Sequence, residues 1–258
     1  MKVIRPDWPA PDWVIALSTT RQNGHCRGVY SGANIARHVG DASAAVDLNW
    51  RELDDELPEG TTIQWLSQEH GDTVVCANNR GETPPADGSW SKMPGIACAV
   101  MSADCLPILL CTRNDGVDQP PVVAAVHAGW RGLARGVVEA CVANMAIEPN
   151  RLMAWLGPAI GPNRFEVGRE VRACFLSSSP SAQCALVSLC FTEIAARPGF
   201  FLADLYALAR IRLRGAGVSD IYGGQYCTFT DDARFYSYRR DGQTGRMATV
   251  ITLKPYLK

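Results

Sequence analysis

The clearest apolar runs of the chain lie in its central third and are short. They cover residues 95–102 (GIACAVMS), 108–112 (ILLCT) and 122–126 (VVAAV). Runs of this length that are apolar at nearly every position are typical of strands buried on both faces. Pro107 suits the start of the second run, because proline cannot donate a ladder hydrogen bond. We predict three strands here, with a break at residues 103–105.

Amphipathic spacing predicts helices around these strands. Beyond the third strand, Leu133, Val137, Cys141 and Met145 are spaced four residues apart, and Pro149 ends the segment. Apolar residues also recur at helical spacing in three other segments, which are residues 46–57, 170–176 and 201–218.

Polar and turn-forming segments fill the rest of the chain. Residues 63–77 read as strand, loop and strand, with residues 67–72 in the loop. The proline, glycine and aspartate of residues 82–95 predict a long surface loop, and 114–121 a hairpin loop. Residues 239–246 (RRDGQTGR) predict a turn between β-prone flanks. Together these elements predict one α+β domain over residues 1–258, with mixed sheets covered by helices.

Composition and charge narrow the classes of partner. The 258 residues are 47% hydrophobic, and the net charge of −1 gives no electrostatic case for nucleic acid or an anionic membrane. No apolar run reaches the roughly 18 residues of a membrane span, and the N-terminus lacks the apolar core of a signal peptide. The ten cysteines are scattered without a CxxC pair. We therefore expect reduced thiols in a cytoplasmic protein.

The third strand ends on a histidine beside a tight turn. His127 is followed by AGWRG and then by the amphipathic segment, so it lies at a strand end, where α/β proteins commonly place their chemistry. If the second and third strands pair antiparallel with Thr112 near Val122, Cys105 lies opposite Gly129. That register would place the thiol close to the His127 imidazole.

Only four histidines occur, and two of them can join Cys105. His70, Cys105 and His127 form a donor set that zinc accepts, with a fourth position left for water or substrate. Their irregular spacing leaves other readings open. Cys105 could be a core thiol beside structural histidines, or a nucleophile activated by one of them. Asp104 could orient either arrangement.

Arginines and aromatic residues suggest an anionic, planar ligand. Arg131 stands at the start of a predicted helix, which suits an anion. Arg239, Arg240 and Arg246 crowd the C-terminal turn and could hold phosphate by bidentate hydrogen bonds, although a solvated turn is equally compatible. Aromatic residues nearby could stack on a base or belong to the core; these are Trp130, Phe229, Phe235, Tyr236 and Tyr238.

Six motifs taken together resemble one family, over about residues 14–253. In chain order they are YSGANIARHVGDASAAVDLNWREL, QEHGDTVV, ADCLPILL, VHAGWRG, GPAIGPNRFEVG and CTFTDDARFYSYRRDGQTGR. The chain resembles the laccase-domain family, first named polyphenol oxidases and later reassigned as zinc-dependent purine nucleoside phosphorylases. Ile35 is a mild departure from the more usual leucine. The resemblance implies an α/β/β/α layered domain with zinc on His70, Cys105 and His127.

The resemblance also implies the reactions. These are phosphorolysis of adenosine, inosine and 5′-methylthioadenosine to the free base and (methylthio)ribose 1-phosphate, and deamination of adenosine to inosine. Arg131, Arg239 and Tyr238 are our candidates for phosphate and substrate. Asp104 or Glu69 could carry the proton. A monomer or weak oligomer is expected.

Three alternatives remain open from the sequence. Copper-dependent phenol oxidation fits the older family name, but a multicopper cluster needs more histidines than four, and Cys/His₂ ligation suits zinc better than copper. A hydrolase with Cys105 as nucleophile would need no metal. A binding module would hold a purine without turnover.

Overall fold

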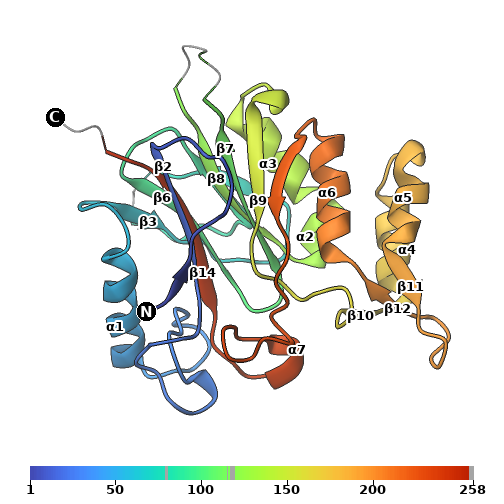
Figure 1. Cartoon of the computed structure of the whole chain (residues 1–258), viewed down its shortest axis with the longest axis horizontal. Helices are drawn as coiled ribbons and strands as arrows, with labels where there is room; N and C mark the ends of the chain where they lie inside the picture. The colour runs from blue at the N-terminus through green and yellow to red at the C-terminus, as the bar shows by residue number, and fades with distance from the viewer. Residues whose placement is uncertain (79–80, 115, 117–119, 256–258) are drawn as a thin grey trace.

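Two large sheets form the centre of the protein in the computed structural model, which describes residues 1–78, 81–114, 116 and 120–255 (Figure 1). The first sheet has the strand order β1-β2-β14-β6-β3. Its strands are β1 (Val3–Ile4), β2 (Val14–Thr19), β14 (Met247–Leu253), β6 (Ile96–Ser102) and β3 (Thr62–Gln64). The β3–β6 pair is parallel and the other pairs are antiparallel.

The second large sheet has the order β13-β9-β7-β8-β5-β4. Its strands are β13 (Asp220–Gly223), β9 (Leu152–Leu156), β7 (Leu106–Thr112), β8 (Val123–Ala128), β5 (Gly88–Ser91) and β4 (Val74–Cys76). The β9–β13 and β4–β5 pairs are parallel, so this sheet is mixed as well.

A small sheet and the helices surround this centre. The small sheet consists of β10 (Glu166–Gly168), β12 (Phe200–Ala203) and β11 (Phe191–Glu193). The α-helices are α1 (Ser43–Asp54), α2 (Trp130–Arg135), α3 (Val137–Met145), α4 (Arg169–Ser177), α5 (Cys184–Leu189), α6 (Leu205–Gly215) and α7 (Tyr238–Asp241). Short 3₁₀ turns cover Gly28–Tyr30, Pro149–Arg151 and Ser181–Gln183.

The side-chain alternation of β7 explains why its sequence is apolar throughout. Leu106, Ile108 and Leu110 pack with the helices, in the same cluster as residues of α2, α3 and α6. Leu109 and Cys111 point the other way and pack against the first sheet. On the far side of that sheet, α1 covers β2, β6 and β14. The layers therefore run α/β/β/α, which confirms the expected fold class.

The expected register of the two central strands is confirmed. Leu106 pairs with Ala128 and Pro107 pairs with His127, so Cys105 directly precedes the ladder on the side of Gly129. The hairpin loop expected at residues 114–121 lies largely outside the described residues.

Two segments differ from expectation because the local sequence pattern does not determine their structure. The predicted surface loop at 82–95 contains the interior strand β5, whose Ser89 and Ser91 are fully buried. These small polar residues look loop-like in sequence, yet they fit between β4 and β8. The helix expected after Gly129 is divided into α2 and α3 by Gly136, whose φ of 103° lies in the left-handed region.

Two further segments were also placed differently from expectation. The segment 201–218 begins as strand β12, and α6 starts only after Asp204, whose side chain caps the N–H of Ala207 at 2.9 Å. The flank before the C-terminal turn is not a strand, since residues 235–237 are irregular, and the first part of the predicted turn forms the short helix α7.

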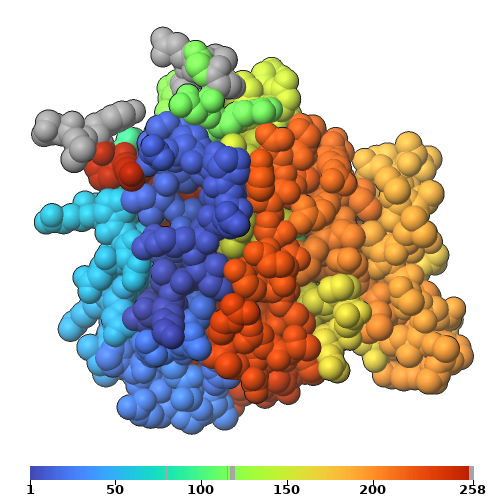
Figure 2. All heavy atoms as spheres, in the orientation of Figure 1, coloured from blue at the N-terminus to red at the C-terminus, as the bar shows by residue number. Residues whose placement is uncertain are grey.

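Segments from the two ends of the sequence lie against each other (Figure 2). The N–H of Arg21 donates to the carbonyl of Arg234 at 2.8 Å, and the Tyr236 hydroxyl donates to the carbonyl of Tyr30 at 2.9 Å. Among the described residues, no helix is both long and apolar enough to cross a membrane.

Candidate metal centre and cavity

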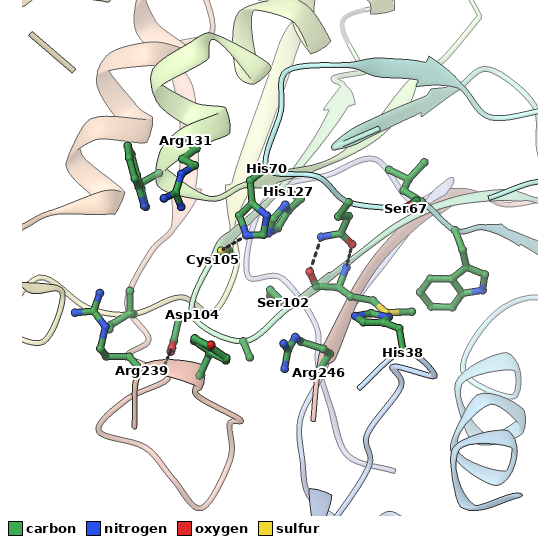
Figure 3. Close-up of a pocket in the computed structure, with 18 of the residues that line it drawn as sticks. His38, Ser67, His70, Ser102, Asp104, Cys105, His127, Arg131, Arg239 and Arg246 are labelled. Atoms are coloured by element: carbon green, nitrogen blue, oxygen red, sulfur yellow. Dashed lines mark hydrogen bonds between the residues drawn. The ribbon is translucent and has the colours of Figure 1, made fainter. Parts of the chain in front are cut away.

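A cavity of about 730 Å³ lies where the loops after β3, β6 and β8 meet the C-terminal segment (Figure 3). This volume is in the range of small-molecule sites, about 300–1,000 Å³. His70, Cys105 and His127 contribute to its wall.

The three predicted donors converge. Their ligand atoms all lie within 4.8 Å of one another, and Cys105 Sγ is 3.7 Å from His70 Nε2. The two imidazole rings meet edge to face, with centroids 4.8 Å apart. Sulfur and nitrogen ligands of a tetrahedral zinc ion are about 3.5 Å apart, given their usual bond lengths. The donor set therefore fits a metal ion.

Gly129 makes room for this cluster. A Cβ at this position would lie 3.0 Å from Cys105 Sγ and 3.0 Å from His70 Cδ2. The tight turn after β8 thus contains a residue without a side chain where the sulfur and the His70 ring approach the backbone.

The buried carboxylate of Asp87 fixes both histidines. One oxygen, Oδ1, accepts hydrogen bonds from His127 Nδ1 at 2.8 Å and from the backbone N–H of His70 at 3.0 Å. The other, Oδ2, accepts from the N–H groups of Gly71 at 2.6 Å and Glu69 at 3.2 Å. Because His127 uses Nδ1 for Asp87, its Nε2 is the nitrogen left for a metal. His70 itself has a φ of 59°, a left-handed conformation that these bonds hold.

Charges within the metal-free cluster favour a thiolate beside a protonated imidazole, which would release its proton to a bound metal. Burial opposes ionisation of Cys105, but attraction to His127 and hydrogen bonds from both histidines lower its pKa to about 6. Burial also opposes a charge on His127, yet Cys105 and Asp87 together raise its pKa to about 9. Asp87 is buried too, and its hydrogen bonds from His127 and the loop N–H groups hold its pKa below the usual range. The cluster thus favours the thiolate, the form of cysteine that ligates metals.

The other predicted site residues are placed unequally around the cavity. Arg131, Arg239 and Tyr238 line it, as does Asp104. Arg131 stacks on Trp130, with its guanidinium carbon 4.4 Å from the ring centroid. Glu69 is not part of the lining.

Asp104 joins the C-terminal segment to the cavity. Its Oδ1 accepts from the Thr228 hydroxyl at 2.6 Å, and its Oδ2 accepts from the Arg239 N–H at 2.7 Å. The Arg239 side chain in turn donates to the carbonyl of Glu166 at 2.7 Å.

The arginines of the C-terminal turn separate in the structure. Arg240 points away from the cavity and donates to the carbonyls of Thr228, Phe229 and Phe235, so it has a structural role. Arg246 does line the cavity. Among the aromatic candidates, Phe235 and Tyr236 are fully buried core residues.

Sequence reasoning did not identify Asp87. It lies in the segment predicted as a surface loop, where an aspartate beside glycine is an ordinary turn residue. The only available signal was its position directly before a short stretch that proves to be β5.

The fold and the site define a layered α+β protein with a His–Cys–His cluster, able to hold a metal ion, in the wall of a small-molecule cavity. The chain belongs to the family described as multi-copper polyphenol oxidoreductase laccase, whose model matches residues 15–254.

Named relatives and solved structures cover nearly the whole chain. A protein named purine nucleoside phosphorylase from Pseudomonas aeruginosa is 48% identical over 97% of this chain and 98% of its own length. The Escherichia coli protein named purine nucleoside phosphorylase YfiH is 44% identical over 98% and 99%. A crystal structure of a Neisseria meningitidis protein matches with a TM-score of 0.90 and 44% identity, covering 99% of this chain and 100% of that one.

Proposed function

We propose that this protein is a zinc-dependent purine nucleoside enzyme. It would split adenosine, inosine and 5′-methylthioadenosine with phosphate and would deaminate adenosine to inosine. The convergence of His70, Cys105 and His127 on the cavity wall is the observation that carries the proposal. The names of relatives that are 44–48% identical over nearly the full length support purine nucleosides and phosphate as substrates.

The donor set favours zinc over copper. One thiolate and two imidazoles form a single cluster of borderline softness, whereas a multicopper centre needs several histidine-rich sites. Another histidine of the described residues, His25, pairs with Glu52 at 2.6 Å and is not a member of the cluster. When bound, the metal would supply Lewis acidity at a position open to the cavity.

The residues of the chain would bind and orient the substrates. Arg131 and Arg239 face the cavity with positive charge, and we assign them to the phosphate that attacks the anomeric carbon. Tyr238 is 61% exposed on the same wall, with the Arg246 guanidinium carbon 5.9 Å from its ring centroid, and we assign it to substrate contact.

A proton must reach the departing purine, and Asp104 is the better placed of the two carboxylate candidates. It lines the cavity, and Thr228 and Arg239 hold its two oxygens in position. Glu69 lies outside the lining. We therefore assign proton transfer to Asp104.

The test uses the purified protein with adenosine, with and without phosphate, and separates adenine, hypoxanthine and inosine by chromatography. We expect phosphate-dependent adenine and phosphate-independent inosine. Cys105→Ala should lose bound zinc, measured by mass spectrometry, and at least about 100-fold in both rates. Cys174→Ala, in α4 outside the cavity, is the matched control. Full turnover by Cys105→Ala without zinc would overturn the proposal, and phenol oxidation dependent on copper would replace it.

A further inference from the structure

Arg246 differs from the other arginines of the cavity in its surroundings. It is half-buried, whereas Arg37, Arg131 and Arg239 are exposed. Arg37 is paired with Asp47 at 2.6 Å. Within the described part of the chain, Arg246 has no carboxylate at salt-bridge distance; Asp104 and Cys105 lie near enough to favour its charge but do not pair with it.

The guanidinium is held in place by one of its nitrogens. Nη1 donates to the carbonyls of Thr244 at 2.8 Å and Gly245 at 3.0 Å. Among the described residues, no acceptor is bound to Nε or Nη2. These two nitrogens form the edge that grips an oxyanion through two parallel hydrogen bonds. The side chain is therefore fixed in orientation with its bidentate edge unoccupied by protein groups.

The backbone around Arg246 is tied to the segment that carries His38. The Arg246 N–H donates to the side-chain oxygen of Asn34 at 2.9 Å, and the N–H of Ile35 donates back to the Arg246 carbonyl at 3.2 Å. Asn34 is fully buried, so this junction belongs to the packed interior. Two motifs from distant parts of the sequence thus meet at one wall of the cavity.

His38 adds a neutral donor beside this charge. His38 is exposed at the cavity rim, but partial desolvation and the neighbouring Arg246 lower its pKa, so the imidazole is uncharged at neutral pH and can donate one hydrogen bond. Both side chains line the cavity. In Figure 3 they lie on one side of the His–Cys–His cluster, and Arg131 and Arg239 lie on the other.

We propose that Arg246 and His38 form a second oxyanion subsite, which takes a phosphate group. A half-buried cation without a carboxylate partner gains most from an anionic ligand, and the free Nε–Nη2 edge matches the geometry of phosphate. The phosphate group can be the 5′-phosphate of a nucleotide, or it can be the free co-substrate, in which case Arg246 and His38 bind that phosphate in place of Arg131 and Arg239. The proposal rests on the proposed function only for the class of ligand. The position and charge of Arg246 do not depend on that function.

Binding measurements test the subsite without turnover. Inorganic phosphate, adenosine and adenosine 5′-monophosphate are titrated calorimetrically into the wild-type protein as purified, Arg246→Gln, Arg246→Lys and the control Arg135→Gln. Arg135 ends α2 outside the cavity lining. We expect Arg246→Gln to weaken phosphate-group binding at least about tenfold, Arg246→Lys to weaken it less, and Arg135→Gln to leave it unchanged.

The ligands distinguish the two sources of phosphate. If free phosphate is the occupant, phosphate should bind in a way that depends on Arg246. Adenosine 5′-monophosphate should then bind no more tightly than adenosine. A 5′-phosphate predicts a nucleotide that binds at least about tenfold more tightly than adenosine, an advantage that Arg246→Gln abolishes.

Other outcomes would overturn the subsite. Equal affinities in the wild type and in folded Arg246→Gln, or no phosphate-group binding by the wild type, would do so. If Arg246→Gln fails to fold, Arg246→Lys and sulfate competition take its place. The subsite is then overturned if Arg246→Lys binds the phosphate group as tightly as the wild type does and sulfate does not compete with phosphate-group binding by the wild type. Failure to turn over nucleosides, with Arg246-dependent binding intact, would remove the proposed function and leave the subsite.

Discussion

Replacing Asp87 by asparagine tests whether one carboxylate sets the geometry of the whole donor cluster. Asparagine keeps the shape of the side chain but has one acceptor oxygen in place of two. Asp87 receives four hydrogen bonds, two at each oxygen, and is 1% exposed. In the variant, either the His70 and His127 donors or the Glu69 and Gly71 donors would face an NH₂ group.

The expected magnitude follows from those contacts. At least two hydrogen bonds to a charged acceptor are lost, each contributing about 1.5–3 kcal/mol. We therefore expect the free energy of unfolding to fall by about 3 kcal/mol, and the melting temperature by roughly 10 °C for a chain of this size. Because His70 and His127 lose their shared anchor, zinc affinity should fall about 10–100-fold.

Two assays separate the local effect from the global one. Chelator competition gives the zinc dissociation constant, and calorimetry of metal-free protein gives stability. Asp72→Asn is the matched control, since Asp72 is exposed in the same loop and should change stability by less than about 0.5 kcal/mol. If Asp87→Asn binds zinc as tightly as the wild type does, Asp87 does not position the ligands, and our reading of the cluster is wrong.

Two further predictions concern the same cluster. Gly129→Ala should displace Cys105 or His70, because the new Cβ would lie 3.0 Å from each, and we expect weaker zinc binding in chelator competition with the fold retained by circular dichroism; undiminished affinity would contradict this. In metal-free protein, alkylation of Cys105 by iodoacetamide should increase as pH rises through about 6, because the thiolate forms there, while Cys98, with a pKa of about 12, stays unmodified at pH 7. Peptide mass mapping would detect both, and a midpoint near pH 8.5 for Cys105 would contradict the assigned environment.

The strand register and the donor cluster could be predicted because their signals are local. Thr112 and Val122 bracket a short connection, so the pairing of β7 with β8 follows from chain geometry, and with it the approach of Cys105 to His127. His70 was proposed as a donor because it is one of only four histidines and lies in a loop between two predicted strands, and the structure places it with the other two donors.

Asp87 could not be assigned in this way, and Arg246 could be named only as one of three candidate phosphate-binding arginines of the C-terminal turn. The function of Asp87 depends on which loop folds over β5, and β5 itself has the composition of a turn. The position of Arg246 depends in part on Asn34, which lies more than 200 residues away in sequence. Such pairings are set by packing of the whole chain, which hydrophobic periodicity does not encode.

The position of β14 has a consequence for how the protein folds during synthesis. This strand comes near the end of the sequence, yet it lies between β2 and β6 in its sheet, and Leu253 pairs with Val14. On the ribosome, β2 and β6 must therefore wait with open edges until β14 emerges, and such edges favour aggregation. The β7–β8 hairpin, whose partners are close in sequence, can form earlier, so we expect the sheet that contains β7 and β8 to assemble first and the sheet carrying β14 to close last.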